Sequence, residues 1–278
     1  MRTSFLFAMA TVAVGATFSS PRAEAQQPVL LRLGGDTGHP IRSRIVVTTF
    51  TRGFSAGHAV PDTLPSTRLT LYVTQILDRL SGDTASFTAV IDSVHGETPD
   101  TPGLSAGIDS VAQGGRGRFA FAADSRGGVI STDSPGEPVN AGTAARRLVG
   151  AAGPREGGFV LPVRPVRVGD TWADSTPMRR ARAGQEIRTR RLFRLERLEA
   201  GGDSGIAVIS MGATLTVQEP SGIAEVPSTG IARFDIAAHR VTAFAITTVF
   251  SEPTPAGPRT TRSETVRYEL GETALPPP

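Results

Sequence analysis

The sequence contains no cysteine and no lysine, and aromatic residues make up only 6% of its 278 residues. The absence of cysteine excludes a disulfide framework, a thiolate metal site and a thiol enzyme. Hydrophobic residues account for 39% of the chain and charged residues for 20%, with 31 Gly and 21 Pro. These proportions exclude a collagen-like or wholly disordered chain. They are typical of a globular protein with one large domain or two small ones.

Long hydrophobic runs are also absent, except near the start of the chain. Residues 1–25 have the parts of a secretory signal: Arg2, an apolar stretch over 5–18, and the small-x-small site Ala23-Glu24-Ala25. Beyond residue 25 there is no uncharged apolar run of about 18 residues, so we expect no transmembrane segment. We therefore expect a periplasmic or secreted protein, cleaved near Ala25, that does not bind nucleic acid.

Period-two alternation of apolar and polar residues dominates the rest of the chain and predicts a mainly β fold. Leu69, Leu71 and Val73 alternate with Thr70, Tyr72 and Thr74. Further strands are expected near 29–33, 43–52, 84–94, 118–121, 128–132, 205–218, 230–237, 241–246 and 260–270. One short helix is expected over about 140–151. Residues 185–199 could form a helix, with leucines three apart, but their alternation favours a strand.

Three short segments recur in the same order and predict a degenerate internal duplication. Arg32–Thr37 resembles Arg167–Thr171, Leu77–Leu80 resembles Leu195–Leu198, and Arg118–Asp124 resembles Arg233–His239. The predicted organisation is a first β repeat over 26–135, a linker with the short helix over 136–165, a second β repeat over 166–270, and a Pro-rich tail over 271–278. Each repeat alone would expose an apolar face, so we expect both to form one curved antiparallel sheet or open barrel.

Two patterns resemble peptidase sites. Asp36-Thr37-Gly38 and Asp203-Ser204-Gly205 match the aspartic-protease loop, in which two carboxylates share a proton. Ser204 with the upstream His58 resembles the nucleophile and base of trypsin-like enzymes. The duplication places the two Asp triplets out of register, and short matches arise easily by chance. We interpret both as Gly-Asp turns, and expect the protein not to be an enzyme.

No pattern predicts a metal or a cofactor. The four histidines, His39, His58, His95 and His239, do not have metal-ligand spacing, and no Gly-rich phosphate loop precedes a helix. A run of eight arginines between 179 and 197 could contact anionic lipid headgroups or polysaccharide. A solvated strand face, with Glu186, Glu196 and Glu199 as partners, is the favoured interpretation.

Residues 161–172, LPVRPVRVGDTW, carry a family resemblance. They resemble an LPxxPVxxGDTW-like signature found in a family of uncharacterised exported bacterial β-sheet proteins. That architecture is distantly similar to half-barrel carriers of the lipoprotein-localisation type, which hold acyl chains in an apolar concavity. The resemblance implies a curved sheet, and it implies no catalytic residues. For Trp172 we expect packing in the core.

The favoured function is a non-enzymatic, exported binding or carrier protein for an apolar or amphiphilic ligand, such as a lipid. The candidate ligand-binding residues share the apolar face of the predicted strands: Leu69, Leu71, Val73, Phe119, Phe121, Phe193, Phe234 and Phe244. The same eight residues could equally form a filled core, because an apolar pattern does not distinguish core from cavity. The alternatives are an envelope structural or interaction module and, less favoured, a secreted peptidase using Ser204 and His58 or Asp36 and Asp203. Oligomeric state and ligand identity stay open.

Overall fold

The computed structural model describes residues 27–52, 54–55, 58–59, 67–97, 118–133, 159–178, 186–199, 205–219, 222–254, 257–271, 275 and 278. The predicted signal at 1–25 and the predicted helix over 140–151 lie outside these residues. Within them, every regular secondary-structure element is a β-strand. No helix in this part of the chain is long and apolar enough to cross a membrane.

Eleven of the described strands form one antiparallel sheet, so the mainly β prediction is confirmed. The first group comprises β1 (Pro40–Arg52), β4 (Thr67–Ser81), β5 (Thr84–Glu97), β6 (Arg118–Asp124) and β7 (Val129–Asp133). The second group comprises β8 (Thr171–Met178), β9 (Glu186–Glu199), β10 (Ile206–Glu219), β11 (Gly222–Asp235), β12 (Arg240–Thr254) and β13 (Gly257–Glu269). A separate pair, β2 (Phe54–Ser55) and β3 (His58–Ala59), forms a second small sheet. Residues 186–199 form a strand, as their alternation predicted.

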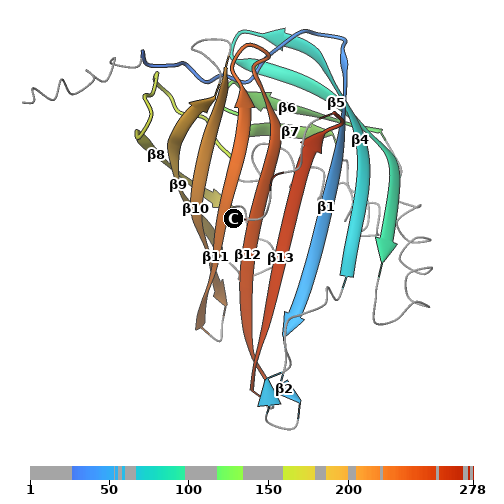
Figure 1. Cartoon of the computed structure of the whole chain (residues 1–278), viewed down its shortest axis with the longest axis vertical. Coiled ribbons are helices and arrows are strands. Elements are labelled where there is room, and N and C mark those ends of the chain that lie inside the picture. The colour runs from blue at the N-terminus through green and yellow to red at the C-terminus, as the bar shows by residue number, and fades with distance from the viewer. Residues whose placement is uncertain are drawn as a thin grey trace, which may run out of the picture.

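The order β7-β6-β5-β4-β1-β13-β12-β11-β10-β9-β8 consists of two meanders joined where β1 pairs with β13. The sheet curves but does not close, and β7 and β8 are its two edges (Figure 1). The first and last of the described strands therefore pair with each other in the middle of the sheet. This places β13 at the centre of the sheet, with five strands on each side.

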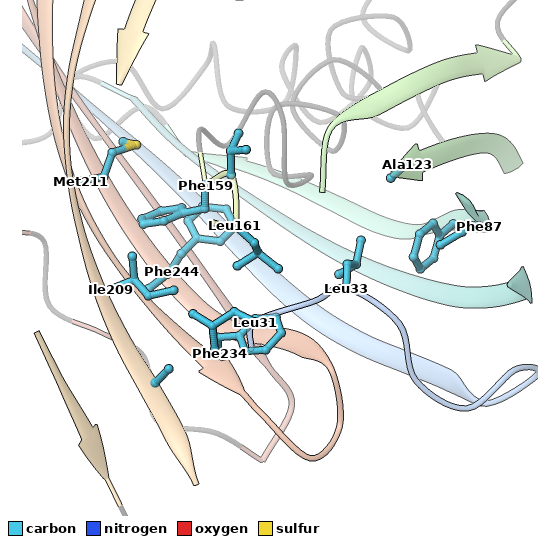
Figure 2. Packing of buried hydrophobic residues seen from close by; sticks show 14 of the residues in the cluster. Leu31, Leu33, Phe87, Ala123, Phe159, Leu161, Ile209, Met211, Phe234 and Phe244 are labelled. Carbon is cyan, nitrogen blue, oxygen red and sulfur yellow. The ribbon is translucent and has the colours of Figure 1, made fainter. Parts of the chain in front are cut away.

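The concave face of the sheet carries the hydrophobic core, because alternate residues of each strand point to the same side. Two chain segments cross this face and cover it: the first strap, residues 27–39, and the second strap, residues 159–170. The straps are joined by an isolated antiparallel bridge, in which the N–H groups of Val29 and Val166 each donate to the other's carbonyl at 2.8 and 2.9 Å. Figure 2 shows side chains of both straps, among them Leu31 and Leu161, pointing into the cluster that contains Phe234 and Phe244.

The strand predicted near 29–33 is wrong, because this segment belongs to the first strap and makes only the single bridge at Val29. Val29, Leu31 and Leu33 are buried, while Leu30 is exposed and Arg32 is half-buried. An extended segment lying across a core also buries every second residue. The period-two pattern therefore identified the extended backbone and the buried side, but not the missing ladder of hydrogen bonds.

Phe159 anchors the second strap in the concave face. Its ring lies 6.2 Å from that of Phe193 and 6.1 Å from that of Phe244. It also packs over Gly230, where an added Cβ would lie 3.1 Å from the Phe159 ring. Trp172 stacks on Phe193 at 5.6 Å, and its indole N–H donates to the Val160 carbonyl at 2.6 Å. The predicted packing role of Trp172 is confirmed.

We predict that Phe159→Ala lowers the free energy of unfolding by about 3–5 kcal/mol, because it leaves a cavity between two fixed aromatic rings. Val163→Ala is the matched control, since Val163 lies on the same strap and is 67% exposed. Denaturant unfolding followed by tryptophan fluorescence measures both changes. Equal effects of the two substitutions would show that the second strap does not seal the core.

Candidate binding site

A pocket of about 560 Å³ opens between the first strap and the sheet, at the end that carries the β4–β5 and β11–β12 turns (Figure 1, upper end). Its floor is apolar and is formed by buried side chains from the first strap and strands β4, β5 and β6: Leu33, Leu77, Phe87 and Phe121. The rings of Phe87 and Phe121 stack at 5.0 Å. Exposed Asp36, His39 and His239 stand at the rim.

Backbone hydrogen bonds to three separate parts of the sheet hold the first strap in place. The Leu33 N–H donates to the Ser125 carbonyl at 2.6 Å, and the Gly34 N–H donates to the His239 carbonyl at 2.9 Å. The Gly38 N–H donates to the Leu77 carbonyl at 2.8 Å. These bonds position the strap as one wall of the pocket.

Gly35 is required at the point where the strap passes the β11–β12 turn. Its φ is +118°, and a Cβ added there would lie 2.9 Å from the Ala238 carbonyl oxygen. The Gly-Gly-Asp-Thr-Gly stretch that suggested a protease loop is thus explained by backbone conformation and close approach. Asp36 itself is exposed.

The charged wall of the pocket comes from strands β12 and β13. Arg240 donates from Nε and Nη2 to the two carboxylate oxygens of Glu269, at 2.9 and 3.3 Å. This hydrogen bonding raises the pKa of Arg240 despite its partial burial. Arg240 and Glu269 therefore neutralise each other.

Arg267 is the second cation of this wall. It donates from Nη2 to Ser43 Oγ at 3.2 Å and to Gln75 Oε1 at 3.3 Å. One side of Arg267 faces the pocket, so the residue keeps some exposed area. Protein atoms surround the rest of it, and this burial lowers the pKa of its guanidinium because the charged form loses contact with water. The negative charge of Glu269 raises the pKa of Arg267, whereas the positive charge of Arg240 lowers it further.

The structure places the eight candidate ligand-binding residues on the concave face, in two groups. Phe121 lines the pocket. The others lie elsewhere on the face, where Leu69 is half-buried and the rest are buried: Leu71, Val73, Phe119, Phe193, Phe234 and Phe244. Leu71, Phe193 and Phe234 are at most 1% exposed and belong to the buried cluster that also contains side chains of both straps. Ligand contact by these residues stays a prediction.

The peptidase candidates are not brought together by any described contact. Asp36 is exposed at the pocket rim, whereas Asp203, Ser204 and the side chain of His58 lie outside the described residues. In the part of the chain that the structure describes, no three His, Asp or Glu side chains are grouped as they would be around a metal ion.

Five of the eight arginines of the run between 179 and 197 lie on the described strand β9, and four of them fit the solvated-face interpretation, whereas Arg179, Arg180 and Arg182 lie outside the described residues. Arg188, Arg190, Arg194 and Arg197 are exposed, and Arg197 pairs with Glu199 at 2.7 Å. Arg191 instead points to the concave side and pairs with Asp174 of β8 at 3.0 Å. Arg191 lies two residues before Phe193 and four before Leu195. Residues two apart in a strand share a face, so this spacing could have indicated the orientation of Arg191.

Sequence analysis missed Arg267, Arg240 and Glu269, which were assigned no role. One signal was present. In residues 261–269 one alternating set is entirely polar: Thr261, Ser263, Thr265, Arg267 and Glu269. The other set is mixed, with Val266 and Tyr268 beside Arg262 and Glu264. A strand face with no apolar residue does not add to a hydrophobic core.

Among known proteins, no family model and no curated protein matches the chain. One similar structure is that of lipovitellin, described under the heading of lipid–protein interactions in lipovitellin. It aligns with 88% of this chain at 12% identity and a TM-score of 0.39. This chain spans 26% of the length of the lipovitellin chain. A protein from Bacteroides fragilis NCTC 9343, provisionally described as exported and with a YmcC-like fold, aligns with 89% of this chain and 100% of its own at 7% identity and a TM-score of 0.28. Both likenesses are distant, and neither establishes what this chain binds. No family signature is confirmed, so the resemblance of residues 161–172 stays a prediction.

We predict that Gly35→Ala destabilises the protein more than Gly38→Ala. Gly38 has φ +80° with no atom within 4 Å of an added Cβ, so alanine there meets only backbone strain, about 1–2 kcal/mol. At Gly35, the same strain is joined by the close contact with the Ala238 oxygen. Denaturant midpoints of the two variants measure the difference. Equal midpoints would contradict the close packing of strap and turn.

Proposed function

We propose that this chain is an exported, non-enzymatic binding or carrier protein whose ligand is apolar or amphiphilic. The observation that carries the proposal is the pocket of about 560 Å³ with an apolar floor and a charged wall. Its walls come from the first strap, four strands of the first meander, and β12 and β13 of the second. Export rests on the sequence of residues 1–25.

The size and lining of the pocket suit one small ligand. Small-molecule sites have volumes of about 300–1,000 Å³ and mostly apolar walls with a few polar groups. Each methylene moved from water onto such a floor contributes about 0.8 kcal/mol. Ten methylenes would therefore contribute about 8 kcal/mol, which is comparable with the cost of about 4–15 kcal/mol for immobilising a ligand.

The lining supports binding over catalysis by a hydroxyl, thiol or amine nucleophile. No Ser, Thr, Cys, Lys or Tyr occurs among the described residues that line the pocket. A hydroxyl or thiol nucleophile next to a base is the usual arrangement for peptidases of the serine and cysteine classes. The pocket offers instead an apolar surface with charged groups at one side.

We predict that the purified protein binds N-phenyl-1-naphthylamine, an uncharged apolar probe, with increased probe fluorescence. Ile41→Trp should weaken this binding at least tenfold, because Ile41 is a half-buried residue of the pocket wall and a larger ring there fills the space. Leu270→Trp is the control, since Leu270 is 50% exposed and does not line the pocket.

Native mass spectrometry of protein purified from its own host provides a second readout, a co-purifying lipid mass. Absence of both probe binding and a lipid mass would overturn the carrier proposal and favour an envelope interaction module. Probe binding that Ile41→Trp leaves unchanged would show that the site lies elsewhere on the molecule.

A further inference from the structure

The pocket contains a cation in an otherwise apolar row of the concave face. In the sheet register, Arg267 of β13 lies directly between Ile45 of β1 and Phe244 of β12. Ile45 is 1% exposed and Phe244 is 3% exposed. A charge in such surroundings is costly unless a partner of opposite charge compensates it.

The partners of Arg267 within the described protein are weak. A guanidinium has five N–H donors, yet both hydrogen bonds of Arg267 come from Nη2 and end on neutral oxygens at 3.2 and 3.3 Å. Charge-assisted hydrogen bonds are usually about 2.7–2.9 Å long. In the described chain Nε and Nη1 have no hydrogen-bond acceptor, so these donors are available to a molecule in the pocket.

Neither carboxylate of the pocket forms an ion pair with Arg267. Both oxygens of Glu269 accept hydrogen bonds from Arg240, so Glu269 stabilises the charge of Arg267 only at longer range. Asp36, the other carboxylate of the lining, is exposed at the rim. Among the described residues of the pocket, the Arg267 guanidinium therefore has no directly bonded carboxylate.

We propose that Arg267 binds the carboxylate of a single-chain, long-chain fatty acid, whose hydrocarbon tail lies on the floor of Leu33, Leu77 and Phe87. This inference rests on the proposed function and specifies its ligand class. One guanidinium without a bonded carboxylate suits a monoanionic head, whereas a phosphate monoester would bring close to two negative charges to the same guanidinium. The planar guanidinium also fits a carboxylate with two parallel hydrogen bonds.

Displacement of N-phenyl-1-naphthylamine by palmitate and by hexadecanol tests the inference at pH 8, below the concentrations at which either aggregates. The two competitors have equal chain lengths and differ in head charge. We expect the wild-type protein to prefer palmitate about tenfold or more, the size expected of a hydrogen bond to a charged group. Arg267→Gln should reduce the ratio of the two affinities to near one, while hexadecanol still binds.

Arg42→Gln is the matched control. Arg42 is an exposed residue of the neighbouring strand β1 that points to the opposite side from Ser43, and its loss lowers the net charge by the same amount. It should keep the palmitate preference. Glu269→Gln is a second variant that retains Arg267 and removes the negative charge nearest to it, so it should increase the preference for palmitate.

The outcomes separate the inference from the proposed function. An unchanged palmitate preference in Arg267→Gln, equal loss in Arg42→Gln, or a decrease in Glu269→Gln would overturn the assignment of Arg267, although probe binding would still support a carrier. If Arg267→Gln does not fold, the double variant Arg240→Gln with Glu269→Gln decides, because it removes the neighbouring ion pair and keeps Arg267. It should retain the palmitate preference, and loss of that preference would overturn the assignment. Failure of the wild-type protein to bind the probe or either competitor would remove both proposals.

Discussion

The constraint on which this structure depends is that one wide curved sheet must have its apolar concave face covered. Within the described residues, the cover is provided by extended backbone: the first and second straps, tied to each other at Val29 and Val166. The straps do not pair along their length with a neighbouring strand. Their backbone groups instead form hydrogen bonds with backbone carbonyls and N–H groups of the sheet strands and turns. Where the straps press on the sheet there is a core, and beside the first strap there is a pocket.

The two straps are anchored in corresponding ways. The Gly38 N–H donates to the Leu77 carbonyl at 2.8 Å, and the Gly169 N–H donates to the Leu195 carbonyl at 2.7 Å. Leu77 and Leu195 begin matched segments of the predicted duplication, but the two donors do not correspond in the match, because Gly38 follows the segment Arg32–Thr37 and Gly169 lies within Arg167–Thr171. The third match fits less well. Asp124 and Asp235 have similar roles, since each carboxylate accepts a hydrogen bond from a backbone N–H of the turn that follows its strand, Gly128 and Ala238 respectively. The sequence match, however, pairs Asp124 with His239. The duplication stays a prediction.

Alternation predicted most of the described strands, because strands that bury one face repeat every two residues, but it gave no strand at 171–178, where β8 forms an edge of the sheet. It favoured a strand over a helix at 185–199, and the structure has a strand at 186–199 with Phe193 and Leu195 inward. It could not distinguish the first strap from a strand, because both bury alternate residues and only the hydrogen-bond partners differ. It also could not separate Phe121, which borders the pocket, from Phe234, which lies in the filled core. That difference depends on where the straps cross, and the crossing is fixed by contacts between residues far apart in the chain.

The central strand explains why part of the concave face stays hollow. Toward that face β13 directs Thr261, Ser263, Thr265, Arg267 and Glu269, and all five keep some exposed area. The neighbouring strands offer apolar side chains at the same level, such as Ile45 and Phe244, so aliphatic residues on β13 would have completed a continuous core. Polar groups there forgo that hydrophobic stabilisation, and burying them fully would cost further free energy without new partners. Among the described residues of β13, Arg267 and Glu269 line the pocket. At Arg267 the polar set of this strand interrupts the apolar row between Ile45 and Phe244, and the pocket opens there instead of a continuous core.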